Sequence, residues 1–301
     1  MGERSKVYMT DLRCRPGVSL LNKLEKLMRT AGIGEINFER KLVAIKMHFG
    51  EPGNLAFLRP NYAKVVADVV KSLGGVPFLT DCNTLYPGRR KNALEHLDAA
   101  YENGFSPLST GCQVIIGDGL RGNDDVEVPV EGAEYIQTAK IGKAIMEADV
   151  IISLSHFKGH EQTGFGGAIK NLGMGCGSRR GKMEQHAQGK PMVAPRRCVG
   201  CRRCATQCAH GAITFGEDRK ASIDWDKCVG CGRCIAVCNT DAIRPGNDAA
   251  MEELGCRMAE YAKAVVDGRP QFHISLVIDV SPYCDCHGEN DLPIVPDVGM
   301  F

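Results

Sequence analysis

The chain has 301 residues, of which 44% are hydrophobic, and its 37 Lys and Arg nearly balance 36 Asp and Glu. This length and apolar content suffice for two domains with a buried core. The formal net charge of +1 gives no case for nucleic-acid binding, and no apolar run reaches the roughly 18 residues of a membrane span. The first ten residues lack the apolar core of a signal peptide. We therefore expect a cytoplasmic protein that binds neither nucleic acid nor membranes.

Short β-branched runs alternate with amphipathic helical stretches from residue 6 to residue 155. Such alternation predicts βαβ units, and therefore an α/β fold with a mostly parallel sheet and helices on both faces. Strands are predicted at residues 7–10, 42–48, 76–80, 113–116 and 150–154, and helices at 20–28, 60–73, 91–103 and 138–147.

Ligands bind beyond the carboxyl ends of the strands in open parallel sheets. His48 follows the second predicted strand, and Asp81 and Asn83 follow the third, so we predict that these three residues bind a ligand. Two alternatives stay open: residues 81–84 can form a helix-capping turn, and His48 can be a buried, hydrogen-bonded histidine.

The fifth strand leads into residues 155–178, which combine polar side chains with closely spaced glycines. Dense glycines let backbone amides approach a ligand, as in phosphate-binding loops, although this spacing matches neither the dinucleotide fingerprint nor the P-loop. A tight packing turn is the alternative. The predicted ligand residues are Gly166, Gly167, Lys170 and Asn171, with an anionic small molecule as partner, and the catalytic candidates are His156, Lys158, His160 and Cys176.

A cysteine motif then occurs twice: CVGCRRCATQCAHGAI, residues 198–213, returns as CVGCGRCIAVCNTDAI, residues 228–243, with nine of sixteen positions identical. Each copy reads C-x2-C-x2-C-x3-C, which resembles the bacterial two-cluster ferredoxin module over residues 192–246. In that module three cysteines of one copy bind a [4Fe-4S] cluster, and the fourth binds the other cluster. The predicted ligands are Cys198, Cys201, Cys204 and Cys238 for cluster 1, and Cys228, Cys231, Cys234 and Cys208 for cluster 2.

Zinc knuckles and a disulfide framework are the alternatives for these eight cysteines. Zinc sites favour two close pairs of ligands, whereas this motif has triplets with a displaced fourth cysteine. The proline that usually follows the fourth cysteine is replaced by Ala209 and Asn239. An odd total of fifteen cysteines favours a reducing, anaerobic cytoplasm over disulfides. Between Arg196 and Gly246, nine Lys and Arg minus five Asp and Glu leave +4, which either offsets cluster charge or attracts an anionic partner.

Helical and strand-like segments resume after the motif, at residues 249–266 and 272–280. The cysteine-rich module is therefore predicted to be an α+β insertion that interrupts one α/β domain. The apolar ending LPIVPDVGMF leads us to expect a truncated domain that continues beyond Phe301. The predicted parts are residues 1–191 for the first part of the α/β domain, 192–246 for the module and 247–301 for the resumed domain.

Seven cysteines lie outside the two repeats. Cys284, Cys286 and His287 follow the last strand and are predicted to bind a further metal ion. The alternative is that the two cysteines are small, buried and reduced. Four others form no group and are predicted to pack in the interior: Cys14, Cys82, Cys112 and Cys256.

Several of these motifs together resemble one known family. The features are FGGAIKNLGMG, a ferredoxin insertion, a closing Ser-Pro-x-Cys-Asp-Cys that leads to PIVPD, and the residues Arg179, Arg180, Lys182 and His186. They are similar to the ferredoxin-carrying form of the bacterial and archaeal family known as domain of unknown function 362. This resemblance covers nearly the whole chain, and it implies architecture and clusters without naming a reaction. The glycine-rich loop and α/β pattern also resemble, more faintly, the nickel-dependent lactate racemase group.

The motifs lead to one function hypothesis and two alternatives. The leading hypothesis is an iron–sulfur oxidoreductase whose two [4Fe-4S] clusters pass single electrons between a low-potential donor or acceptor protein and a ligand or metal site in the α/β domain. The alternatives are an electron-transfer adapter without catalysis of its own, and a maturation factor that loads a metal or cofactor. The sequence identifies neither the substrate nor the direction of electron flow.

Overall fold

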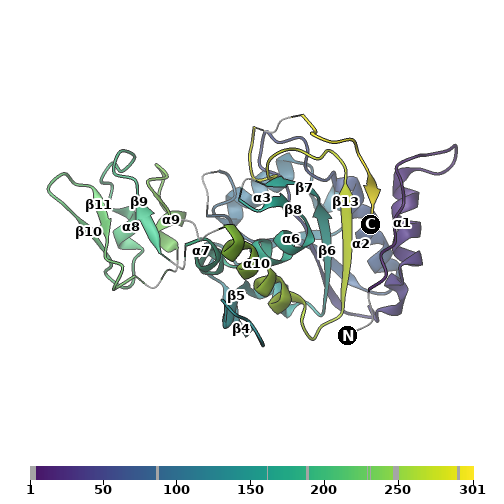
Figure 1. Cartoon of the computed structure of the whole chain (residues 1–301), viewed down its shortest axis with the longest axis horizontal. Coiled ribbons are helices and arrows are strands. Elements are labelled where there is room, and N and C mark those ends of the chain that lie inside the picture. The colour runs from purple at the N-terminus through teal and green to yellow at the C-terminus, as the bar shows by residue number, and fades with distance from the viewer. Residues whose placement is uncertain are drawn as a thin grey trace.

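The computed structural model describes residues 5–85, 88–160, 162–187, 190–228, 230, 232–246, 251–289 and 292–301. A large α/β body and a small cysteine-rich lobe, residues 191–245, lie next to each other along the long axis of the molecule (Figure 1). No helix within the described ranges is long and apolar enough to cross a membrane.

The body is built on a six-stranded sheet in the order β14-β13-β6-β1-β2-β3. Five strands are parallel, and β14 adds an antiparallel edge. The predicted α/β class with a mostly parallel sheet is therefore confirmed. The strands are β1 (Leu42–Lys46), β2 (Val76–Asp81), β3 (Gln113–Ile116), β6 (Val150–His156), β13 (Gln271–Val277) and β14 (Gly299–Met300).

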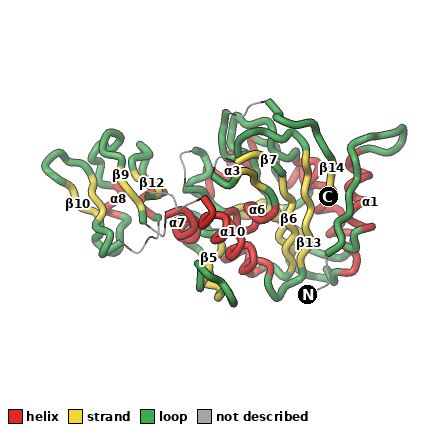
Figure 2. The backbone as a smooth tube through the Cα atoms, in the orientation of Figure 1, coloured by secondary structure: helices red, strands yellow, loops and turns green. Residues whose placement is uncertain are grey.

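Helices cover both faces of this sheet because successive side chains of a central strand point to opposite sides. In β1, Val43 and Ile45 enter one apolar core, whereas Ala44 enters the other. Figure 2 shows the strands β6 and β13 of this sheet in yellow, with helices in red on either side. The first core is covered by α1 (Leu20–Thr30), the 3-10 helix Ile33–Glu35, α2 (Pro60–Ser72), α3 (Ala93–Glu102) and α4 (Pro107–Thr110). The second is covered by α5 (Lys143–Glu147), α6 (Ala168–Cys176) and α10 (Met251–Val266).

Two β-hairpins and one more helix complete the body. The hairpins pair β4 (Asp125–Pro129) with β5 (Thr138–Gly142), and β7 (Lys158–His160) with β8 (Gly164–Gly166). Helix α7 (Arg179–Ala187) follows α6 and leads toward the lobe (Figure 1).

The cysteine-rich lobe forms its own small sheets at one end of the molecule (Figure 1). Its first and last strands, β9 and β12, pair in an antiparallel manner, so the chain enters and leaves the lobe at one place. Strand β13 then rejoins the main sheet beside β6. The body therefore contains segments from before and after the lobe, while the exact domain boundaries stay a prediction. The lobe comprises β9 (Pro191–Val193), α8 (Arg203–Thr206), β10 (Ile213–Phe215), β11 (Ala221–Ile223), α9 (Arg233–Ala236) and β12 (Ile243–Pro245).

Two elements differ from the sequence-based prediction. Of residues 7–10, only Thr10 pairs, through an isolated bridge to Met300, and the side chain of Val7 is exposed. Residues 138–147 form strand β5 and then helix α5 instead of one helix. The cause is tertiary, because residues 138–142 pair with β4 along their whole length.

Gly173 allows α6 and α10 to pack closely against each other. A Cβ atom at this position would lie 2.0 Å from the carbonyl oxygen of Met258 on α10. Such an overlap involves the backbone of the neighbouring helix, so it can be relieved only by moving one helix. A Cβ atom at Gly255, also on α10, would meet nothing within 4 Å.

We expect Gly173→Ala to lower the free energy of unfolding by about 1–3 kcal/mol, because the added methyl group overpacks the contact between α6 and α10. Gly255→Ala is the matched control and should leave the stability unchanged or raise it by up to about 1 kcal/mol, since alanine favours the helix. Urea unfolding followed by circular dichroism measures both variants. Equal effects of the two substitutions would contradict the packing explanation.

Candidate functional site

A buried ion pair lies at the carboxyl ends of β1 and β2, where the parallel register brings Lys46 next to the last residues of β2. Lys46 Nζ is 3.0 Å from Asp81 Oδ1, and it donates a hydrogen bond of 2.8 Å to Asn171 Oδ1 on α6. The Asn171 amide donates in turn to the backbone oxygen of Lys46. Burial would raise the pKa of Asp81, but Lys46 and other neighbouring cations lower it below its usual value. Two predicted ligand residues, Asp81 and Asn171, are thus connected through Lys46.

A second buried pair connects the loop after β2 to the loop after β1, and the latter bonds to the loop after β13. Arg90 Nε donates to Glu51 Oε2 at 2.6 Å, and the Arg90 guanidinium is also 3.9 Å from Asp81 Oδ2. The backbone N–H of Glu51 donates to the carbonyl oxygen of Asp285 at 3.0 Å. The sequence analysis missed Arg90, because no local pattern distinguishes it from its neighbour Arg89, whose side chain is exposed.

His156, at the end of β6, is held between two hydrogen-bond acceptors. Its Nδ1 lies 2.9 and 3.0 Å from the carboxylate oxygens of Asp285, and its Nε2 lies 2.7 Å from the carbonyl oxygen of Ile278. The ring is thus fixed by a contact at each of its two nitrogens. Lys158 Nζ is 3.2 Å from Asp285 Oδ2. Burial raises the pKa of Asp285, but Lys158 and His156 outweigh it and lower this pKa to about 2.

The loop after β13, which carries Asp285, also places the thiols of Cys284 and Cys286 near Lys170. Lys170 Nζ donates to Cys284 Sγ at 2.8 Å, and the side chains of Cys284 and Cys286 are hydrogen-bonded to each other. The bond from Cys286 lowers the pKa of Cys284 well below its usual value, and Lys170 adds to this effect against the opposing effect of burial. The same bond and burial raise the pKa of Cys286. Cys284 is therefore the thiolate of the pair and Cys286 the thiol.

Two buried histidines near these charges are neutral. His48 Nδ1 accepts a hydrogen bond of 2.9 Å from the backbone N–H of Gly50. Burial lowers the pKa of His48 well below its usual value, and nearby cations, Arg90 first among them, lower it further. His96 lies 3.9 Å from Asp81, and burial lowers the pKa of its ring to about 3. The predicted ligand residue His48 thus has one nitrogen occupied by its own loop.

Asn83 contacts a different carboxylate. Its backbone N–H and its side-chain amide donate to Asp118 Oδ1 at 2.9 and 2.8 Å. The other oxygen, Asp118 Oδ2, is buried and has no hydrogen-bond partner among the described residues. Burial raises the pKa of Asp118 to about 6, although Lys182 acts in the opposite direction.

The glycine-rich segment forms a hairpin followed by a helix. Gly166 ends β8, and a Cβ atom there would contact the side chains of Lys170 and Lys158 at 3.2 and 3.5 Å. Gly167 is the N-cap of α6. His160 Nδ1 accepts two backbone N–H groups from the turn after β7. Gly166 therefore borders two of the buried lysines, and the predicted anion site at this segment stays a prediction.

Cys176 lies in the second apolar core, where Cys82 donates to its carbonyl oxygen. Burial raises the pKa of Cys176 to about 11, so its thiol stays protonated at neutral pH. His287 is exposed; its backbone N–H donates to the carbonyl oxygen of Cys284, and its own carbonyl oxygen accepts from the Asn54 side chain at 3.0 Å. Within the ranges that the structure describes, no group of three His, Cys, Asp or Glu side chains is arranged around a single metal ion. Catalysis by Cys176 and a further metal ion at Cys284, Cys286 and His287 stay predictions.

Two small cavities in the cysteine-rich lobe each combine cysteines from both repeats. The fourth cysteine of each repeat lines the cavity of the other repeat, which is the crossed arrangement that the spacing predicts. Cys231 lies outside the described residues. One cavity is lined by Cys198, Cys201, Cys204 and Cys238, and the other by Cys208, Cys228 and Cys234.

The two repeats have matching backbone geometry around these cavities. Gly200 and Gly230, at equivalent positions, have φ angles of +69° and +70°, which favour glycine. Four residues after the fourth cysteine of each repeat, a backbone N–H donates to that cysteine's sulfur. These bonds run from Ala212 to Cys208 Sγ at 3.3 Å and from Ala242 to Cys238 Sγ at 3.2 Å.

Two loops of the second repeat attach the lobe to the body. Lys91 pairs with Asp241 and also donates to the carbonyl oxygen of Cys238 at 3.4 Å. Arg179 of α7 is buried, and a Cβ atom at Gly232 would lie 2.7 Å from its Cγ. The absence of a side chain at Gly232 therefore allows the second repeat to approach α7.

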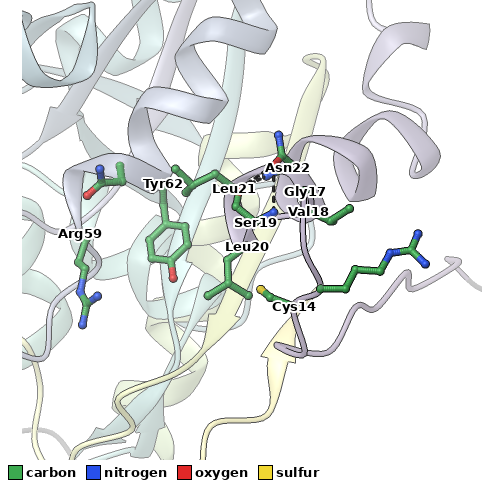
Figure 3. A pocket seen from close by; sticks show the side chains of 11 residues that line it. Cys14, Gly17, Val18, Ser19, Leu20, Leu21, Asn22, Arg59 and Tyr62 are labelled. Atoms are coloured by element: carbon green, nitrogen blue, oxygen red, sulfur yellow. Dashed lines mark hydrogen bonds between the residues drawn. The ribbon is translucent and has the colours of Figure 1, made fainter.

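The N-terminal arm forms a separate hollow of about 640 Å³ against the starts of α1 and α2 (Figure 3). Its lining includes Ser19 and Asn22, which form the capping box of α1, and Arg59 and Tyr62 at the start of α2. None of the predicted site residues lines this hollow.

Comparison with known proteins gives one family and several distant relatives. The model of the family described as "Domain of unknown function (DUF362)" matches residues 43–301. A thylakoid-associated protein of Synechocystis sp. is 29% identical over 163 residues, which cover 52% of this chain and 46% of that protein. The chain thus spans about half the length of this curated relative.

Two solved structures are similar in fold at 12% sequence identity and a TM-score of 0.44. The lactate racemase apoprotein of Thermoanaerobacterium thermosaccharolyticum matches over 89% of this chain and 47% of its own length. A Thermotoga maritima protein matches over 93% of this chain and 53% of its own length. At this level of similarity neither structure assigns a function, and the faint racemase resemblance stays a prediction.

Asp118 should destabilise the fold as the pH rises from about 4 to about 7. Its usual pKa is 3.8 and its folded pKa is about 6, so the folded state binds the proton more tightly. The loss of stability therefore begins above the unfolded pKa and is complete above the folded one. Asp118→Asn keeps the acceptor for Asn83, so wild type should lose stability relative to this variant across that range.

Urea unfolding at several pH values measures this difference. Asp98→Asn, which changes an exposed carboxylate on α3, is the matched control and should follow wild type at every pH. A constant difference between Asp118→Asn and wild type from pH 4 to 7 would contradict the assignment.

Proposed function

We propose that this chain, which belongs to the DUF362 family, is a two-cluster iron–sulfur protein. It would pass single electrons between a low-potential redox protein and the charged site of its α/β body. This charged site is the group of contacts made by Lys46, Arg90, Lys158 and Lys170. The observation that carries this proposal is the crossed lining of the two cavities in the lobe. In two-cluster ferredoxins, the fourth cysteine of each motif binds the cluster of the other motif. Neither zinc knuckles nor local disulfides require this exchange of the fourth cysteine.

The residues around the cavities fit a [4Fe-4S] cluster in each. Thiolates are the ligands that such clusters use, and backbone N–H groups donated to the sulfurs are one of the factors that set their reduction potential. The bonds to Cys208 and Cys238 provide such donors in both repeats. Apolar side chains from both repeats and from the body, among them Met183 and Leu85, surround the cysteines and limit the access of water. A bound cluster would supply one-electron transfer.

The surface of the lobe supports contact with an acidic redox partner. Arg196, Arg197, Arg202 and Arg203 are exposed next to Cys201, which is itself exposed. Positive charge at this edge would attract and orient an acidic electron-transfer protein. The edge that carries Cys201 is therefore the expected entry point for electrons from outside.

Bonded residues connect the other side of the lobe to the charged site in the body. Lys91 contacts the carbonyl oxygen of Cys238, and its neighbour Arg90 pairs with Glu51. The backbone of Glu51 then bonds to Asp285, the residue between the two thiols of the body. We infer that electrons leave the cluster bound by Cys238 toward this site.

An adapter without its own chemistry is the competing function. The buried pair of His156 and Asp285, the contact of Cys284 with Lys170, and the ion pairs of Lys46 and Lys158 favour an oxidoreductase over it, because an adapter needs no such charges. A maturation factor would need a metal-loading site in the body, and among the described residues none is formed.

Substitution of pairs of cysteines tests the crossed assignment. Cys198→Ser and Cys238→Ser should each remove about half of the iron, because each removes a ligand of cluster 1. The double variant Cys198→Ser/Cys238→Ser should lose no more than either single variant. By contrast, Cys208→Ser/Cys238→Ser should lose both clusters. Iron per chain and electron paramagnetic resonance after dithionite reduction, both under anaerobic conditions, measure these outcomes.

Cys256→Ser is the control, since Cys256 lies outside both cavities and is exposed on α10. This variant should keep its full iron content. The prediction that Cys14 and Cys256 pack in the interior is wrong, because both are exposed. If Cys198→Ser/Cys238→Ser lost twice as much iron as either single variant, the two cysteines would bind different clusters. A wild-type chain that binds no iron after anaerobic reconstitution would contradict the proposed function itself.

A further inference from the structure

The loop after β13 carries two thiols, Cys284 and Cys286, that belong to neither repeat of the lobe. We propose that this pair is a redox-active site that cycles between a dithiol and a disulfide by exchange with a dithiol reductant. The inference goes beyond the proposed electron transfer. It concerns two cysteines that are not among the eight predicted cluster ligands.

The loop that carries the pair is fixed on two sides. Gly159 on β7 donates its N–H to the carbonyl oxygen of Ser281 at 2.8 Å, and a Cβ atom at Gly159 would lie 2.2 Å from the carbonyl oxygen of Pro282. On the other side, Glu51 donates its N–H to Asp285, the residue between the thiols. The loop that carries both thiols is thus fixed by the fold, and only Asp285 separates the two cysteines in the chain.

The two sulfurs differ in exposure and in charge. Cys284 is 3% exposed and contacts the Lys170 ammonium at 2.8 Å, whereas Cys286 is more accessible. In thiol–disulfide exchange, the sulfur that is better stabilised as a thiolate leaves more readily. An incoming thiolate should therefore attack Cys286, and Cys284 should leave toward Lys170.

The reaction balances with a dithiol as the two-electron donor. A thiolate of the reductant bonds to Cys286 Sγ, the Cys284–Cys286 bond breaks, and Cys284 leaves as a thiolate. The second thiolate of the reductant then attacks its own sulfur in the mixed disulfide, which releases the oxidised reductant. Cys286 takes up one of the two protons that the dithiol loses, and the other goes to solvent.

Lys170 connects this chemistry to the buried charges of the site. The nearby Asp285 carboxylate already serves both His156 and Lys158, so the thiolate of Cys284 provides the negative charge next to Lys170. Oxidation to a disulfide would remove that charge from beside the half-buried Lys170 ammonium, which is unfavourable. Lys170 should therefore favour the reduced form of the pair, as a cation beside a thiolate does in oxidising dithiol proteins.

The proposal is tested on the full-length chain under anaerobic conditions. The masses of its tryptic peptides are measured after redox titration. The protein is equilibrated with mixtures of reduced and oxidised dithiothreitol, acid-quenched, alkylated with iodoacetamide and digested with trypsin. Cleavage after Lys263 gives a C-terminal peptide whose only cysteines are Cys284 and Cys286. We expect a two-state change from a doubly alkylated peptide to an internal disulfide.

Removal of the lysine charge gives the decisive comparison. Lys170→Gln should shift the equilibrium toward the disulfide by about tenfold, equivalent to about 30 mV for a two-electron couple. Lys170→Arg keeps the charge and should stay near wild type. Lys64→Gln, an exposed lysine on α2, is the matched control. The circular dichroism of each variant establishes that it is folded.

Three outcomes would overturn the proposal. The peptide could stay fully alkylated at every ratio of dithiothreitol, or Lys170→Gln, if folded, could titrate like wild type. In the third, the thiols would be protected from alkylation until a chelator is added, which would indicate a metal site. A failure here leaves the iron content of the cysteine variants unaffected, so the two proposals fail separately.

Discussion

Buried charge at the carboxyl ends of the parallel sheet is the constraint on which the rest of the body depends. An ammonium or guanidinium group that leaves water without a partner costs several kcal/mol, so each must meet an anion inside the fold. Those anions come from loops that are distant in sequence, and each loop is thereby fixed relative to the others. The pairs are Lys46 with Asp81, Arg90 with Glu51, Lys158 with Asp285, and Lys170 with the thiolate of Cys284.

The same constraint explains how the lobe is positioned relative to the body. Arg90 and Lys91 are adjacent, and they bond in different directions: Arg90 to Glu51 in the body, and Lys91 to Asp241 and the backbone of Cys238 in the lobe. A shift of this loop would break both sets of bonds together. The lobe is therefore connected to the charged site through Arg90 and Lys91, which are consecutive in the chain, and through the bonds that each of them makes.

Periodicity was enough to predict the sheet, because buried parallel strands are continuous apolar runs with helices between them. It failed at residues 138–147, where pairing with β4 overrides the helical pattern. The glycine-rich segment illustrates a second limit. Gly173 belongs to this segment, but its role is to let α6 pack against α10, and that role depends on Met258, 85 residues later in the chain.

The sequence indicated which segments could contribute to the candidate site, but not which side chains pair with each other there. His156, Lys158 and Lys170 were identified from one segment, but Asp285 lies 129 residues from His156, and Arg90 lies 39 residues from Glu51. Which carboxylate meets which cation depends on strand order, and a single sequence does not specify that order. The cysteine repeats are different, because their spacing alone predicts that the fourth cysteine of each repeat joins the other repeat, and the two cavities are lined in that way.

Electron count connects the lobe and the thiol pair. A [4Fe-4S] cluster exchanges electrons one at a time, whereas the reduction of a disulfide needs two. Two clusters next to one thiol pair would match these numbers, and the stabilisation of the Cys284 thiolate by Lys170 would make the pair the acceptor. The buried cations would then do more than hold the loops in place. Because Asp285 is already shared by His156 and Lys158, the Cys284 sulfur is the partner that Lys170 contacts, and the proposed oxidation of the pair would change this contact.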